Sequence, residues 1–186
     1  MHGSMAKKKT PEYLQKVENL LSADYANKEH KDYLQEKAAE MDIPIVSDSL
    51  SYLSYTFDRE YTRKEDPKAK GLFPFFQKNK GVHAMCDYML FCWYNHKLFI
   101  LLVELKHGKD NTREQLKAGI CFAQFIANTL NRVEKKINIT PEIRQITIRN
   151  KHIIKKRTTR INDVEYDRDN FCTFEGGKFY LKEFLK

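Results

Sequence analysis

Long apolar runs are missing from this chain of 186 residues. A membrane-spanning helix needs about 20 consecutive apolar residues. The longest apolar run, Leu98 to Val103, has only the length of a buried strand. The N-terminus also lacks the hydrophobic core of a signal peptide. These absences predict a cytoplasmic protein that does not associate with a membrane.

Closely spaced cysteine pairs are missing as well. The four cysteines are Cys86, Cys92, Cys121 and Cys172, and no two of them form a C-x-x-C pair. Zinc fingers and dithiol redox motifs depend on such pairs, so neither class of site is predicted. Because cytosolic thiols are kept reduced, we expect buried free cysteines.

Repeats and low-complexity segments are absent too, and the length suits one domain. Met1 to Met5 is interpreted as a cloning remnant with Met5 as the natural start, and Lys7 to Lys9 as a solvated tail. Residues 10–186 are therefore expected to form a single domain. A domain of this size buries roughly two-thirds of its unfolded surface, so it needs no disulfide or metal to fold.

Positive charge is in excess. The formal net charge is +8 and the isoelectric point is about 9.2. Such a balance favours a polyanionic partner, because lysine and arginine side chains that neutralise phosphates release condensed counterions. The charge concerns partners and solubility and does not bear on the fold.

The N-terminal part of the chain has helical and then extended patterns. A proline near the start and apolar residues at helical spacing predict a short helix from Pro11 to Leu21. A second helix is expected from Glu29 to Met41. Its apolar stripe consists of Tyr33, Leu34, Ala38 and Met41. Partial alternation of apolar and polar residues from Ile45 to Phe57 predicts a strand. The mostly charged residues 58–80 are expected to form a long excursion between strands.

A β-hairpin is the clearest prediction. Cys86 to Tyr94 and Lys97 to Lys106 are largely apolar, and the dipeptide Asn95-His96 between them is typical of a turn. The second strand is apolar on both faces between Leu98 and Val103. We therefore expect a central strand that is covered by helices on both sides.

A long helix and further strands follow the hairpin. Apolar residues at steps of three and four predict a helix from about Thr112 to Lys136, and Thr112 and Gln115 fit a capping box. A strand is predicted from Ile143 to Ile148, and Phe179 to Phe184 closes the chain. This order predicts an α/β domain with a mixed sheet flanked by helices.

Three charged residues stand at the end of the apolar hairpin. Glu104 and Lys106 share one face of their strand, because strand side chains alternate. If the turn has two residues, Tyr94 pairs with Lys97, and the same register sets Asp87 opposite Glu104. An odd shift of register would separate them. Two adjacent carboxylates repel each other unless a cation compensates, and oxygen ligands suit Mg²⁺ or Mn²⁺.

The segments Cys86-Asp87-Tyr88-Met89-Leu90-Phe91 and Leu101-Leu102-Val103-Glu104-Leu105-Lys106 resemble the signature of PD-(D/E)xK nucleases. That signature is an aspartate at the start of one hairpin strand and Glu-x-Lys at the end of the next. The order of elements is similar to the αβββαβ core of this restriction-endonuclease-like superfamily, so the resemblance covers roughly residues 29–150. Cys86 stands where proline would be.

The resemblance implies a role for each residue. Asp87, Glu104 and the backbone carbonyl of Leu105 would bind one or two Mg²⁺ ions, which activate water and screen the scissile phosphate. Lys106 would orient or deprotonate that water, or stabilise the transition state. The alternative is that both carboxylates are ordinary solvated strand ends and that Lys106 forms an ion pair with one of them.

Several further residues keep two interpretations. Gln115 matches a glutamine that RecB-type relatives use near the active site, although Gly119 stands where their tyrosine is expected, and it also fits the capping box. A glutamate on the first core helix often reaches the metal in relatives. The candidates for it are Glu29, Glu36 and Glu40, and spacing does not choose between them. His83 is favoured as structural or exposed rather than as a ligand, and His107 receives no role.

Two segments offer contacts to nucleic acid. Residues 149–160 contain six Lys or Arg residues and no acid, so they could follow a phosphate backbone or form a solvated loop or edge strand. The aromatic residues Phe73, Phe75 and Phe76 could stack on bases, but packing onto the sheet is favoured.

The resemblance implies a Mg²⁺-dependent nuclease that hydrolyses phosphodiester bonds. DNA is favoured over RNA because most relatives act on DNA, and structure-specific or non-specific cleavage is favoured because no separate specificity domain is visible. The alternative functions are a non-catalytic nucleic-acid-binding module and a regulatory component of a defence or mobile-element system. Dimerisation is left open.

Overall fold

The computed structural model describes residues 10–36, 40–57, 81–82, 84–108, 111–135, 137–149 and 164–186. These residues form a mixed α/β fold with two sheets. The five-stranded sheet has the order β3 (Tyr52–Tyr55), β4 (Tyr88–Tyr94), β5 (Lys97–Lys106), β6 (Glu142–Arg149) and β7 (Phe171–Phe174). The three-stranded sheet has the order β1 (Tyr33–Glu36), β2 (Met41–Val46) and β8 (Phe179–Tyr180). The helices are α1 (Glu12–Leu20), α2 (Arg113–Val133) and the short 3-10 helices η1 (Ala23–Tyr25) and η2 (Leu181–Leu185).

Both sheets are mixed. Strands β3, β4 and β5 form an antiparallel meander, and α2 then crosses over so that β6 runs parallel to β5 and β7 parallel to β6. In the smaller sheet, β2 is antiparallel to β1 and parallel to β8. The predicted helix near Pro11, the hairpin, the long helix and the strand near Ile143 are all confirmed.

The hairpin has the predicted two-residue turn and the predicted register. Asn95 and His96 have φ angles of 47° and 62°, the left-handed conformation that a type I′ turn requires at both central positions. Tyr94 pairs with Lys97, and the ladder continues without interruption to Tyr88 and Val103.

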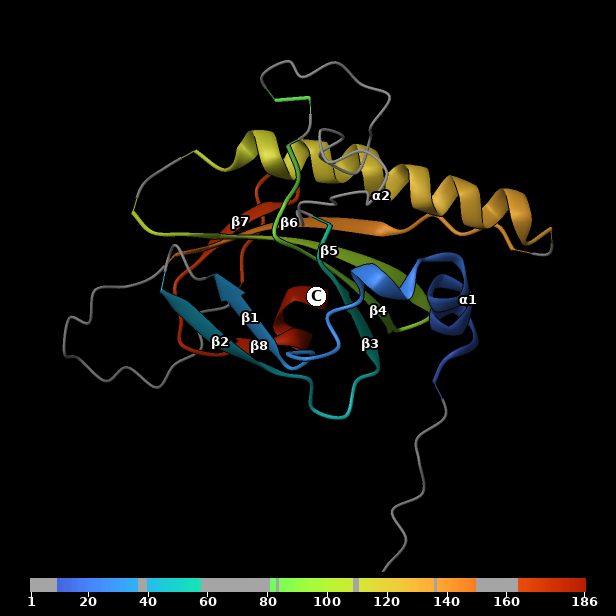
Figure 1. Ribbon diagram of the computed structural model, residues 1–186, viewed down its shortest axis with the longest axis horizontal. Helices are drawn as coiled ribbons and strands as arrows, with labels where there is room; N and C mark the ends of the chain where they lie inside the picture. Colours follow the sequence, from blue (N-terminus) through green and yellow to red (C-terminus); the bar gives the residue numbers. More distant parts are fainter. Residues whose placement is uncertain are drawn as a thin grey trace, which may run out of the picture.

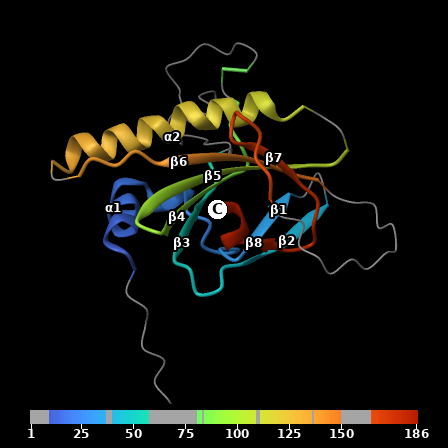
Figure 2. The same ribbon diagram turned by 180° about the vertical axis from the view of Figure 1, so that it is seen from behind.

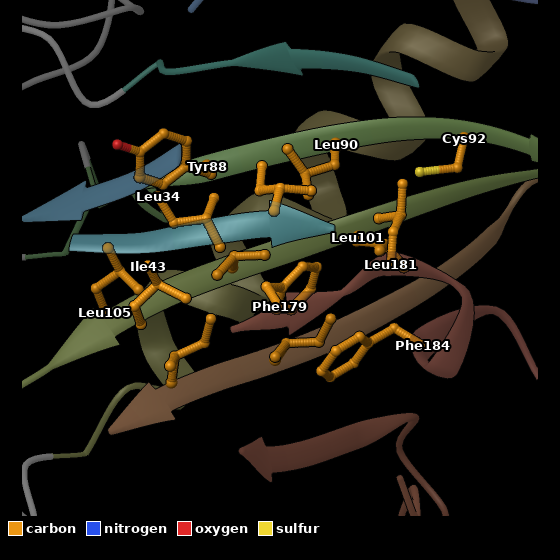
Figure 3. Close-up of a cluster of buried hydrophobic side chains, with 14 of the residues drawn as sticks. Leu34, Ile43, Tyr88, Leu90, Cys92, Leu101, Leu105, Phe179, Leu181 and Phe184 are labelled. Atoms are coloured by element: carbon orange, nitrogen blue, oxygen red, sulfur yellow. The ribbon is translucent and has the colours of Figure 1, made fainter. Parts of the chain in front are cut away.

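Strand β5 is buried on both faces, but α-helices cover only one of them. Leu98, Ile100 and Leu102 share a core cluster with apolar residues of α1 and α2. The opposite face packs against the three-stranded sheet and η2, as the views from both sides indicate (Figures 1 and 2). Figure 3 shows this second core, where Leu34 and Ile43 approach the central strands from the small sheet. The expectation of helices on both faces was wrong, because an apolar strand face requires a cover but does not determine its kind.

The predicted helix from Glu29 to Met41 was wrong. The described part of this segment forms β1 and the start of β2, which pair antiparallel. Along β2, burial alternates, with Met41, Ile43 and Ile45 buried, and this period of two supports a strand. The predicted strand from Ile45 to Phe57 is two strands, β2 and β3, and the turn between them has positive φ angles at Asp48 and Ser49.

The capping box at Thr112 was also wrong. Thr112 has α-helical backbone angles, and its side chain makes no cap bond to the described backbone. Its hydroxyl lies 2.5 Å from the Thr147 hydroxyl on β6, while Asn111 Oδ1 accepts the first bond from Arg113 N at 3.0 Å. The threonine therefore joins the start of α2 to the sheet.

Three of the cysteines, Cys86, Cys92 and Cys172, are buried free thiols as expected, whereas Cys121 is exposed on α2. No helix in the described ranges has the length and apolar character needed to cross a membrane. His83, the aromatic residues Phe73, Phe75 and Phe76, and the basic stretch after Arg149 lie outside the described residues.

Candidate active site

Asp87 and Glu104 lie across from each other at the end of the hairpin. Asp87 directly precedes β4, and its Oδ2 accepts a hydrogen bond of 2.6 Å from the backbone N–H of Leu105. The ladder between β4 and β5 stops one residue pair earlier, at Tyr88 and Val103. The aspartate side chain therefore continues the strand pairing in place of a backbone carbonyl and is held beside Glu104.

Glu104 is a carboxylate inside the core. Its residue is 2% exposed, whereas Lys106, two positions along the same face, has a side chain that is 30% exposed. Lys106 Nζ lies 3.1 Å from Glu104 Oε1. The second oxygen, Oε2, is buried and has no hydrogen-bond partner within the part of the chain that the structure describes.

The surroundings of Glu104 favour its neutral form. Burial, and secondly the negative charge of Asp87, raise its pKa from an ordinary 4.5 to about 7, although the ion pair with Lys106 acts in the opposite direction. A buried, incompletely paired carboxylate next to a second carboxylate is costly for folding. Such an arrangement is typical of a functional site.

A buried threonine adjoins Glu104 and contacts a second one; the sequence analysis did not single out Thr147, and it interpreted Thr112 only as a helix cap. Thr147 is paired in register with Glu104 on the parallel strand β6 and is completely buried. Its hydroxyl contacts that of Thr112, which is 2% exposed. The pairing of β5 with β6 brings Thr147 here, and a parallel register across a helical crossover has no signal in the local sequence.

Gln115 lies in the first turn of α2 and is half-buried. Thr112 contacts Thr147 beside Glu104, and a Cβ on Gly119 would lie 3.2 Å from Leu102 Cδ1. The helix therefore runs antiparallel to β5. The helical segment from Gly119 back to Gln115 spans about the same length as the strand segment from Leu102 to Glu104. This brings Gln115 toward Glu104. Gly119 itself leaves no room for a tyrosine.

The three glutamate candidates for the first core helix do not lie on a helix. Glu29 and Glu40 are exposed, and Glu36 ends β1. Strand β1 packs through Leu34 on the face of the five-stranded sheet opposite Glu104. None of the three therefore lies on a helix beside Glu104. His107 is exposed.

The residues fit a hard, oxygen-binding divalent cation better than zinc. Within the described ranges, no three or more His, Cys, Asp or Glu side chains are close enough together to hold a metal ion. A structural or catalytic zinc site needs at least three such ligands. Mg²⁺ is commonly bound through one or two carboxylates, with water and substrate phosphates as the other ligands. Asp87 and the unpaired oxygen of Glu104 meet this simpler requirement.

Comparisons of the chain with protein-family models, with curated proteins and with solved structures found no match. The interpretation of the site therefore depends on its own geometry: two adjacent carboxylates, one of them buried, with an ammonium group and an amide-bearing helix turn beside them.

Proposed function

We propose that the chain is a metal-dependent nuclease of the PD-(D/E)xK type, with Asp87, Glu104 and Lys106 at its active centre. Its substrate is a nucleic acid, with DNA favoured over RNA, and its metal is Mg²⁺ or Mn²⁺. The order α1, β3, β4, β5, α2, β6 supports the proposal, because it matches the αβββαβ order of that superfamily once the β1–β2 hairpin is counted as an insertion. The chain departs from the core of that superfamily in one respect: α1 and α2 pack on the same face of the sheet.

The observation that carries the proposal is the burial of Glu104 next to Asp87, with a carboxylate oxygen that has no hydrogen-bond partner among the described residues. All residues of β5 from Leu98 to Leu105 except Glu104 are apolar. An apolar side chain at position 104 would extend the core without any desolvation cost, whereas the buried carboxylate opposes folding. A ligand that contacts both carboxylates accounts for this feature, and a divalent cation is the simplest such ligand.

Each side chain has a task in phosphodiester hydrolysis. A bound Mg²⁺ would lower the pKa of a water molecule and neutralise negative charge on the scissile phosphate. Asp87 and Glu104 would hold it, and the Leu105 N–H that bonds Asp87 sets the direction of that carboxylate. Lys106 stands 3.1 Å from Glu104 Oε1, where its ammonium group can stabilise negative charge on the phosphate or orient the attacking water. Gln115, in the first turn of α2, would bind the phosphate or that water.

The proposal is tested by incubating the protein with plasmid, linear and single-stranded DNA and with RNA, in Mg²⁺, Mn²⁺ or EDTA. Glu104→Gln and Lys106→Ala are expected to reduce cleavage at least 100-fold, since each removes a group that acts in the transition state. Glu142→Gln and Lys97→Ala are matched controls. These two residues form an ion pair (2.5 Å) at the opposite ends of β5 and β6 from the site.

Metal-dependent cleavage that survives in the controls and disappears in the two site variants would support the nuclease. If the wild-type protein is as inert as the variants with every substrate and metal, the catalytic proposal fails. Binding of nucleic acid by that inert protein would then favour the non-catalytic module.

A further inference from the structure

A second cation lies next to Lys106 on the neighbouring strand. Strand β6 runs parallel to β5, with Thr147 in register with Glu104 and Arg149 in register with Lys106. Paired residues of neighbouring strands project from the same face of a sheet, about 4.8 Å apart at the backbone. The strand ends therefore present two carboxylates, Asp87 and Glu104, followed by two cations, Lys106 and Arg149.

The position of Arg149 is not that of a residue protecting a sheet edge. Strand β6 is internal, because β7 pairs with it from Gln145 to Ile148. Arg149 Nη1 donates a hydrogen bond to the carbonyl of Gly108, which follows β5 with a φ of +81°. A guanidinium group has five N–H donors in a planar fork, so it can hold this carbonyl and contact an anion as well.

The local field favours an anion in front of this pair. Like charges that are paired across strands destabilise a sheet, and an anion between them removes that cost. The start of α2 adds partial positive charge at the same place, because Thr112 touches Thr147, two residues before Arg149 on the same strand face. Glu104 forms the ion pair with Lys106, but in the proposed function Glu104 binds the metal cation.

We propose that Arg149 binds the phosphate backbone of the nucleic acid beside the phosphate that Lys106 faces. This assignment rests on the proposed function and deepens it, because it makes the substrate a polynucleotide held at two adjacent phosphates. Arginine suits this role, since its fork can bind phosphate oxygens in a bidentate manner.

The test measures binding without cleavage. Fluorescence anisotropy in EDTA gives the Kd for a labelled DNA 20-mer, as a single strand and as a duplex, at several salt concentrations. Arg149→Gln should weaken binding about tenfold and make the slope of log K against log salt less steep by about 0.9 for the duplex, or about 0.7 for the single strand. Arg149→Lys should keep the wild-type slope, because it keeps the charge.

The controls separate charge from folding. Glutamine at position 149 removes the charge but keeps a polar side chain with N–H donors, and thermal unfolding of both variants reports whether the strand end is intact. Arg132→Gln removes an exposed arginine about 28 Å along α2 from Arg113 and should change neither the Kd nor the slope.

An unchanged Kd and slope in Arg149→Gln would overturn the assignment and leave Arg149 with a structural role such as its contact with Gly108. Loss of the slope in Arg149→Lys as well would also overturn it, because the charge would then not be the cause. Wild-type protein that shows no salt-dependent binding would refute it in the same way. A protein that binds through Arg149 yet cleaves nothing would refute the nuclease and leave the binding surface standing.

Discussion

Replacing the buried carboxylate Glu104 by glutamine should stabilise the metal-free protein at neutral and alkaline pH. Glutamine has nearly the same shape, and its amide oxygen can accept the hydrogen bond from Lys106. It has no charge to desolvate and does not repel Asp87. Lys106 remains partly in water in the variant, so its charge is not left stranded.

The size of the effect follows from the pKa of Glu104. In the folded protein this pKa is about 7, compared with an ordinary 4.5. Between these values the folded state binds more protons than the unfolded state, so this carboxyl makes wild-type stability fall as the pH rises from about 4.5 through about 7. At about 1.36 kcal/mol per pKa unit, the full loss is about 3 kcal/mol, reached above pH 7. For a chain of this length that corresponds to a Tm difference of about 6–12 °C.

The assay is urea or thermal unfolding of both proteins in EDTA at pH values from 4.5 to 8.5. The free energy of Glu104→Gln minus that of the wild type should be near zero at the acidic end and should rise toward about 3 kcal/mol above pH 7. Other titrating groups cancel in this difference. Glu142→Gln should instead lower stability by a nearly constant amount over most of this range, because its ion pair with Lys97 lowers the pKa of Glu142 and this carboxyl stays charged except at the acidic end. A difference that is independent of pH, or a Glu104→Gln protein that is less stable at pH 8, would refute the reasoning.

Three other changes test the same region. Mg²⁺ at 100 times its Kd should increase the free energy of unfolding of the wild-type protein at pH 8 by about 2.7 kcal/mol and so raise its Tm, but it should not raise the Tm of Asp87→Asn. An equal Tm shift in both proteins would contradict a metal site at Asp87. Thr147→Val should cost about 1–3 kcal/mol in urea unfolding, because the buried Thr112 hydroxyl loses its partner, and an unchanged midpoint would contradict this. Gly119→Tyr should cost about 3 kcal/mol or more, since even a Cβ would lie 3.0 Å from Cys86 Sγ, and a normally stable variant would show that α2 can move away.

Local patterns were sufficient to predict the hairpin and its register. A two-residue turn fixes which residues face each other, and the period of two then determines which side chains share a face. This is why the sequence alone groups Asp87, Glu104 and Lys106. The geometry agrees, with Asp87 bonded to Leu105 N–H and Lys106 bonded to Glu104.

The errors arose where two periods fit the same residues or where tertiary structure decides. Leu34 and Met41 are seven residues apart, which suits one face of a helix, yet they are buried residues of two different strands. Strand β7 was not predicted, because it has only four residues and depends on β6 for its pairing. The same dependence hid Thr147 and Arg149, whose positions beside Glu104 and Lys106 require the parallel register of β5 and β6.

The site and the core are built from the same strand, and this connects stability with function. Strand β5 is buried from Leu98 to Leu105, and its central position gives Glu104 little freedom to move. The rigidity that holds the two carboxylates close together also prevents them from separating to relieve their repulsion. A cation bound at this position would relieve that repulsion, and the affinity of the site for metal would increase as the pH rises toward the pKa of Glu104 and level off above it. Lys106, with its partly exposed side chain, marks where the buried strand reaches solvent and where a phosphate can approach.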